Sequence, residues 1–149
     1  MNGGDSRNLA PLTTEEVDWW YARLASQRFA WAIDLAGRGI GVARLTHVDE
    51  ASRRMDYAIG ILAPDLWNQG LGTEATRLVL RFAFDELRLH RVGLLVLDIN
   101  ERAQAMYEKC GFVREGVVRE GVLVGDEWHS DVTMSILEAE YRQASVQWQ

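Results

Sequence analysis

Two glycines stand directly before a long amphipathic segment in the stretch WNQGLGTEATRLVLRFAF, which covers residues 67–84. Apolar side chains recur at helical spacing behind the glycines, and this pattern predicts a helix from about Thr73 to Leu89. Apolar runs with the composition of strands stand before the helix (MDYAIGIL) and after it (VGLLVLDI). A strand, a helix and a second strand in this order form a β-α-β unit, which brings two parallel strands into one sheet.

The remaining segments predict mostly antiparallel pairs around that unit. Alternating apolar residues separated by glycine-containing turns indicate hairpins, and a short apolar stripe with a glycine after it indicates a helix. These elements are a helix over 13–26, strands over 28–35 and 40–48, a helix over 101–110, and strands over 112–124 and 127–137. We therefore predict one α+β domain over 1–149 with a mixed, mostly antiparallel sheet, a loose N-terminus (1–12) and a C-terminal tail (138–149).

Composition limits the class of protein. A chain of 149 residues with 48% hydrophobic residues can bury one core, and a net charge of −6 disfavours nucleic-acid binding and suits a cationic partner. The single cysteine, Cys110, excludes an internal disulfide, and no apolar run has transmembrane length. His47, His90 and His129 lack metal-ligand spacing. We expect a cytoplasmic protein without a metal, a membrane or a nucleic-acid partner.

A glycine-rich loop before a helix is typical of phosphate sites, and three kinds begin in this way. A Walker-type loop is excluded because Thr73 and Glu74, and no lysine, follow the second glycine. GLGTEA matches the dinucleotide pattern G-x-G-x-x-A, and Asp98 ends the next strand where a ribose-binding acid would lie. However, Gly70 comes eight residues after Leu62, and the chain supplies only one β-α-β unit.

The third interpretation is a pyrophosphate site made of backbone. Several consecutive N–H groups at a helix N-terminus bind diphosphate, and glycine lets the backbone approach it closely. A plain glycine turn that caps a core helix remains an alternative at this point.

The segment from Arg53 to Leu137 resembles the GCN5-related N-acetyltransferase (GNAT) superfamily, and within it the RimJ/RimL branch. The shared motifs are ordered: YAIGI, then W-x-x-G-x-G-T-E-A, LDIN, and A-x-x-x-Y-x-x-x-G-F. The resemblance implies a GNAT-type sheet flanked by helices, with a central parallel strand pair that splays apart. It also leads us to expect that the usual first strand and helix of the family are lacking before the LAPLTTEEVDWWYARL segment.

The same resemblance implies acetyl-CoA as co-substrate. The backbone edge of one strand would pair with the pantetheine arm, the glycine loop would hold the pyrophosphate, and Asn100 would bind a pantetheine amide or cap the next helix. The implied cofactor-binding residues are Ile59, Gly60, Ile61, Leu62, Gln69, Gly70, Leu71, Gly72, Thr73, Asn100 and Tyr107. An N–H group of the same strand edge would stabilise the oxyanion.

For catalysis, the resemblance implies Tyr107 as the acid that protonates the leaving thiolate, although its spacing also suits a packed core side chain. Asp56 is the candidate general base, with a solvent-facing strand residue as the alternative, and Glu127 and His129 are weaker candidates. The expected acceptor is a primary amine: a protein N-terminus, a polyamine or another small amine. A GNAT-like domain that binds acyl-CoA or a partner without turnover stays open, as does a homodimer.

Overall fold

The structure, a computed structural model, describes residues 29–62, 64–66 and 69–148. The predicted loose N-terminus (1–12) and the predicted helix over 13–26 lie outside these residues. Within the described ranges, no helix is both long enough and apolar enough to cross a membrane.

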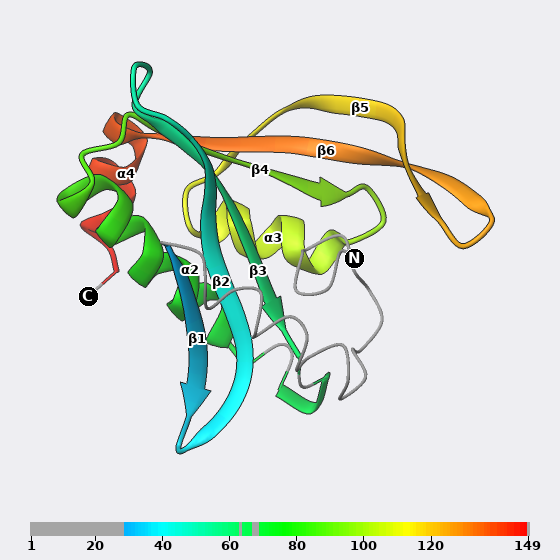
Figure 1. Ribbon diagram of the computed structural model, residues 1–149, viewed down its shortest axis with the longest axis horizontal. Coiled ribbons are helices and arrows are strands. Elements are labelled where there is room, and N and C mark those ends of the chain that lie inside the picture. The colour runs from blue at the N-terminus through cyan, green and yellow to red at the C-terminus, as the bar shows by residue number, and fades with distance from the viewer. Residues whose placement is uncertain (1–28, 63, 67–68, 149) are drawn as a thin grey trace.

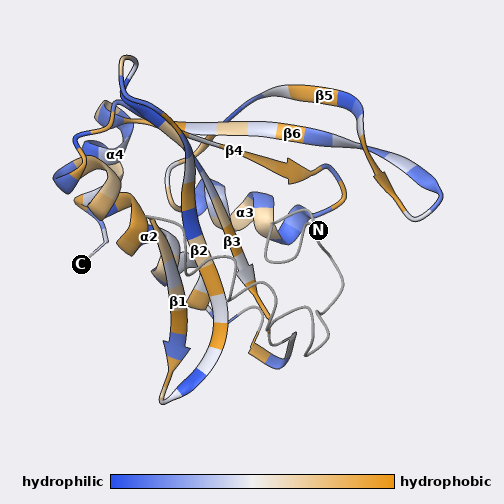
Figure 2. Ribbon diagram, viewed as in Figure 1, coloured by the Kyte–Doolittle hydropathy of each residue, from blue (hydrophilic) through white to orange (hydrophobic). Residues whose placement is uncertain are grey.

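Within the described residues, one six-stranded sheet organises the fold, in the order β1-β2-β3-β4-β6-β5 (Figure 1). Four neighbouring pairs are antiparallel, and only β3 and β4 run parallel. The mixed, mostly antiparallel sheet is therefore confirmed. The strands are β1 (Ala30–Leu35), β2 (Arg38–Asp49), β3 (Arg54–Ile61), β4 (Arg91–Leu97), β5 (Val113–Val124) and β6 (Glu127–Leu137). Figure 2 shows that β4 is apolar along most of its length, as expected for a strand covered on both faces.

The helix after the glycine loop begins two residues earlier than predicted. Gly70 is its N-cap with φ of 78°, a left-handed conformation that glycine adopts without strain, and α2 spans Leu71–Arg81. The sequence predicted that the helix continues to residue 89, and this predicted end is wrong. A π-helical turn, η2 (Phe82–Glu86), follows α2, and the helix stops there. Leu87 N–H bonds to Phe82 O there, one residue further back than in an α-helix. The other helical segments are η1 (Pro64–Leu66), α3 (Glu101–Lys109) and α4 (Glu138–Ser145).

The C-terminal segment, predicted as a tail, contains a helix that packs onto the domain. Residues 138–145 form α4, and Tyr141 in it is only 2% exposed. The Tyr141 ring stacks on Phe84 at 4.8 Å, and its hydroxyl donates to Asp85 at 2.9 Å. Burial raises the pKa of Tyr141 to about 12, with the Asp85 carboxylate acting in the same direction. Trp148 folds back as well and packs edge-on against Tyr141, with the ring centroids 5.7 Å apart.

The central parallel strands separate after three residue pairs. β3 and β4 pair only at Arg54↔Arg91, Met55↔Val92 and Asp56↔Gly93. Beyond this point β3 stays with β2 as far as Ile61, and β4 stays with β6 as far as Leu97. The predicted splayed pair is therefore confirmed, and the opening lies at the carboxyl ends of the two strands.

The close approach of β2 to β3 depends on Gly41. A Cβ atom at this position would overlap the carbonyl oxygen of Gly60, which is backbone and cannot move aside alone. Gly41→Ala should therefore lower the free energy of unfolding by about 2 kcal/mol, as overpacked sites do. Chemical denaturation of the whole chain measures this change. Gly116→Ala is the matched control, because its Cβ would have Thr133 Oγ1 at an ordinary 3.6 Å, and an equal loss in both variants would contradict the explanation.

Candidate functional site

The N-terminus of α2 presents a row of backbone amides. Glu74 N–H donates to Gly70 O at 3.0 Å and makes the first hydrogen bond of the helix. The N–H groups of Leu71, Gly72 and Thr73 therefore have no acceptor inside the helix, and they point along its axis with the positive end of the helix dipole. Gln69 lies just before them, with its side-chain amide donating to Asp65 O at 3.0 Å. This arrangement is what a diphosphate requires.

Glycine is favoured at the two loop positions, Gly70 and Gly72, by different physical features. Gly70 needs its left-handed φ, whereas Gly72 does not have a positive φ. A Cβ atom on Gly72 would meet, among the described residues, only Met106 Cε at 3.6 Å, an ordinary contact. Glycine inside a helix costs about 0.5–1 kcal/mol relative to alanine. The packing of the described residues does not require glycine at position 72, although glycine there destabilises the helix. A first turn without a side chain at this position suits a ligand that comes close to the backbone.

Only some of the β3 residues predicted to bind the pantetheine arm turn their backbone groups toward the opening. Leu62 N–H donates to Ile40 O at 2.6 Å, so the backbone groups of Leu62 are directed to β2. Main-chain groups alternate along a strand, and those of Gly60 therefore also point to β2. The prediction for Gly60 and Leu62 is corrected in this respect. The backbone groups of Ile59 and Ile61 point to the side from which β4 has separated.

Tyr107 lies at the base of the opening, on the side of the helices. Its side chain is fully buried, and its ring packs edge-on against Tyr57 at 6.4 Å and Phe112 at 5.5 Å. Tyr57 directly follows the last residue of β3 that pairs with β4, and its hydroxyl bonds to Thr76 of α2 at 2.9 Å. Tyr107 is therefore a packed core residue that also lies near the point where β3 and β4 separate, so the two roles considered for it do not exclude each other.

Asn100 caps α3, one of the two roles considered for it. Its Oδ1 accepts a hydrogen bond from Ala103 N–H at 3.1 Å, and the residue is 7% exposed. It directly follows the turn that ends β4, so it lies at the same end of the sheet as the opening. The role toward pantetheine stays a prediction.

Asp56 and Tyr107 are not brought together. Met55, Tyr57 and Ile59 are buried, and Tyr57 reaches α2, so alternation turns the Asp56 carboxylate to the opposite face of the sheet. There its Oδ2 lies 3.2 Å from His47 Nδ1, and its side chain is 58% exposed. His47 was not identified as a partner from sequence, because its position depends on an irregularity in the β2–β3 register after Thr46.

The weaker candidates lie at the end of β4. His129 Nε2 is 3.4 Å from Glu127, and His129 Nδ1 is 3.9 Å from Asp98. Glu127 and His129 belong to β6, and Asp98 lies in the turn after β4. This turn forms the β4 side of the opening. Cys110 is fully buried, and burial raises the pKa of its thiol to about 11, in agreement with an unreactive side chain.

Comparison with known proteins adds family-level information. Residues 5–113 match the family described as "Acetyltransferase (GNAT) domain". The chain is similar to YdaF of Bacillus subtilis, a ribosomal N-acetyltransferase-like protein (33% identity over 68% of this chain and 55% of YdaF). It is also similar to the spermidine N(1)-acetyltransferase of Escherichia coli K12 (27% identity over 74% of this chain and 59% of the relative). The chain thus spans somewhat more than half the length of these two relatives.

Solved structures share the architecture. A spermidine N-acetyltransferase from Vibrio cholerae in complex with CoA and spermine superposes with a TM-score of 0.74 at 25% identity. That alignment covers 88% of this chain and 79% of the other. The sheet with its splayed parallel pair is therefore an arrangement found in acetyltransferases. The dinucleotide interpretation is wrong, because the described sheet contains a single parallel pair between antiparallel strands.

Proposed function

Since this chain belongs to the GNAT acetyltransferase family, we propose that it transfers the acetyl group of acetyl-CoA to a primary amine by direct attack within a ternary complex. The observation that carries the proposal is the position of the α2 N-terminus beside the splayed ends of β3 and β4. One feature suits a diphosphate and the other suits an extended arm with amide groups. A relative in this fold that binds CoA and spermine supports the same assignment.

The residues present fit coenzyme A. The amides of Leu71 to Thr73 would hold the pyrophosphate, and the backbone of Ile59 would pair with the pantetheine arm. Acetyl-CoA supplies a thioester, whose carbonyl carbon forms the new bond to the amine nitrogen while the bond to sulfur breaks. A backbone N–H at the strand edge would stabilise the negative charge that develops on the carbonyl oxygen.

The reaction also needs two proton transfers, one to the leaving thiolate and one from the amine. The groups proposed for them lie on opposite faces of the sheet. The Tyr107 hydroxyl, on the side of the helices, would give a proton to the leaving thiolate. Asp56, on the opposite face, would receive the amine proton, directly or through water. Amine entry and thiolate departure on opposite faces are consistent with this placement.

We propose a polyamine as the first acceptor to test, with peptide N-termini second. A net charge of −6 attracts polycations, and two of the similar proteins are named for spermidine acetylation. The test is calorimetric titration with acetyl-CoA and with NADH, followed by measurement of thiol release in the presence of spermidine or a short peptide. Acetyl-CoA binding with thiol release supports the proposal. Binding without release from any amine would instead indicate the non-catalytic alternative, and binding of neither ligand would contradict both.

Asp56→Asn should lower kcat/KM for the amine about tenfold and leave acetyl-CoA binding unchanged. The effect is modest because an exposed carboxylate shares the proton transfer with water. Rates measured across pH check this expectation, and His47→Gln, which removes only the partner of the carboxylate, is the control. Unchanged rates in Asp56→Asn at every pH would remove Asp56 from the mechanism.

A homodimer remains part of the proposal. Three apolar side chains on the outer hairpin, Val117, Leu123 and Trp128, are each more than half exposed. Leu123 and Trp128 pair directly across β5 and β6. Analytical ultracentrifugation of the wild-type protein and of Trp128→Ser would measure whether this surface joins two copies.

A further inference from the structure

Gln104 is a buried polar side chain that no motif in the sequence singled out. It lies on α3, is 5% exposed, and shares the buried face of this helix with Tyr107. A buried amide is costly unless its donors and its acceptor are bonded, and an apolar side chain is the usual residue on the inner face of a helix. The bonds that Gln104 makes therefore indicate what this side chain does.

The amide of Gln104 has a partner for each of its polar atoms. Its Nε2 donates to Leu97 O at 2.9 Å and to Asp98 O at 3.0 Å. Its Oε1 accepts a hydrogen bond from Arg114 Nη2, which comes from an exposed residue of β5. These partners fix the orientation of the amide, because a flipped amide would direct its oxygen at two carbonyl oxygens and its nitrogen at a guanidinium. The side chain thus joins α3 to the end of β4 and to β5.

The two carbonyls that Gln104 binds lie where β4 leaves the strand conformation. Main-chain groups alternate along a strand, so the carbonyls of successive residues normally point in opposite directions. Leu97 O and Asp98 O instead meet at one nitrogen. Leu97 O also accepts from Asn100 N–H at 3.0 Å, which closes a four-residue turn. Gln104 therefore holds this turn, and with it Asn100, against α3.

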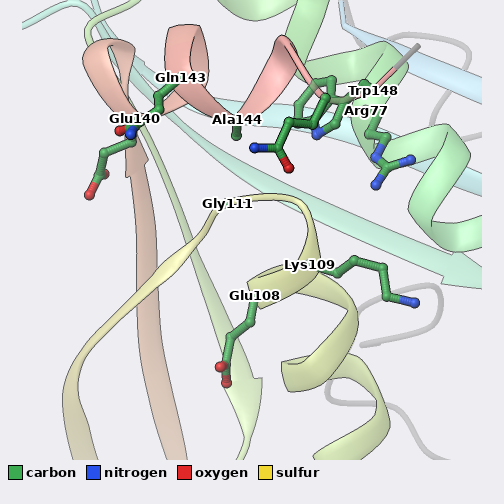
Figure 3. Close-up of a pocket in the computed structure, with 9 residues that line it drawn as sticks. Arg77, Glu108, Lys109, Gly111, Glu140, Gln143, Ala144 and Trp148 are labelled. Atoms are coloured by element: carbon green, nitrogen blue, oxygen red, sulfur yellow. The ribbon is translucent and has the colours of Figure 1, made fainter.

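The other end of α3 borders a cavity. The cavity has a volume of about 560 Å³ and lies between α2, α3 and α4, with Arg77 and Lys109 among its lining residues (Figure 3). Figure 3 shows Glu108 and Lys109 at this end of α3, with α4 on the other side of the cavity. Side chains that border a cavity lose part of the contacts that close packing provides. The bonds of Gln104 near the start of α3 are therefore important for the position of the helix on the sheet.

We infer that Gln104 is a positioning residue for the binding of the pantetheine arm. Its amide fixes the turn after β4, and through this turn it fixes Asn100 and the β4 side of the opening. Gln104 acts without touching the co-substrate. The inference rests on the proposed function, because it explains how one wall of the same site keeps its shape. The amides at the N-terminus of α2 do not depend on this turn, so loss of the Gln104 amide should affect the arm and not the diphosphate.

Gln104→Leu tests the inference, because leucine has a similar volume and no amide. Calorimetry measures the binding of CoA and, by displacement, of adenosine diphosphate, which has a diphosphate and no pantetheine arm. The variant should bind CoA about tenfold more weakly than the wild-type protein, whereas its affinity for adenosine diphosphate should change by less than about twofold. A general loss of structure would weaken the binding of both ligands alike.

Two other variants complete the test. Arg114→Met removes only the exposed partner that orients the amide, and it should weaken CoA binding by about threefold without affecting adenosine diphosphate. This variant also provides the test if Gln104→Leu does not fold. Tyr141→Phe is the matched control, since it removes a side-chain hydrogen bond to Asp85 that attaches α4, and it should leave both affinities unchanged. Circular dichroism verifies that each variant is folded.

Failure of the inference and failure of the proposed function give different results. Unchanged CoA affinity in folded Gln104→Leu, or in Arg114→Met where the leucine variant does not fold, would overturn the inference and leave the proposed function intact. An equal loss for both ligands would also overturn it, because the role of Gln104 would then be structural. A wild-type protein that binds CoA and not adenosine diphosphate would contradict the separation of arm and diphosphate on which the inference depends. Binding of neither ligand by the folded wild-type protein would contradict the proposed function and the inference together.

Discussion

Gly72→Asp should weaken acetyl-CoA binding by at least about 100-fold, or about 2.7 kcal/mol, without unfolding the protein. The new carboxylate would lie in the first turn of α2, where the amides of Leu71 to Thr73 are proposed to hold the pyrophosphate. It would repel the diphosphate and occupy its space. The helix itself tolerates the change, because an acidic residue in the first turn interacts favourably with the helix dipole.

Two further substitutions at this position separate charge from size. Gly72→Asn introduces nearly the same volume without the charge, and Gly72→Ala adds only a Cβ, which would meet Met106 Cε at 3.6 Å. We expect the affinity for acetyl-CoA to fall from Ala to Asn to Asp. Calorimetric titration of the three folded variants measures this order. An affinity like that of the wild-type protein in Gly72→Asp would show that the glycine loop is a plain helix cap.

Tyr107→Phe should lower kcat by up to about 10²-fold while leaving the affinity for acetyl-CoA unchanged. The phenylalanine ring keeps the contacts with Tyr57 and Phe112 and loses only the hydroxyl that we propose as the proton donor. The effect is limited because a leaving thiol with a pKa near ~8.5, as for cysteine, departs fairly well without an acid.

A neighbouring tyrosine offers the matched control for this variant. Tyr57→Phe also removes one buried hydroxyl, but this hydroxyl bonds to Thr76 Oγ1 and has no proposed role in proton transfer. It should cost about 1 kcal/mol of stability and little activity. Thiol-release rates with spermidine, together with thermal unfolding, distinguish the two. If both variants lose kcat equally, Tyr107 acts by packing and is not the acid.

Much of the fold was readable from the sequence, because it depends on patterns within short stretches. Alternation predicted the hairpins, and helical spacing predicted α2 and α3. The same short patterns located the glycine loop, and the structure then placed Gly70 at the N-cap with a positive φ. The motifs carried the family resemblance as well, and with it the splayed parallel pair that the structure contains.

The sequence by itself therefore determined the order of the elements, the parallel pair at the centre of the sheet and the helix N-terminus that would meet a diphosphate. Only the tertiary structure decided that the last residues fold back as α4, because Tyr141 finds Phe84 and Asp85, more than fifty residues away. It also decided which backbone amides face the opening. The tertiary packing forms the cavity that both Arg77 and Lys109 line. These features depend on contacts between distant segments, and periodicity and turn chemistry carry no information about such contacts.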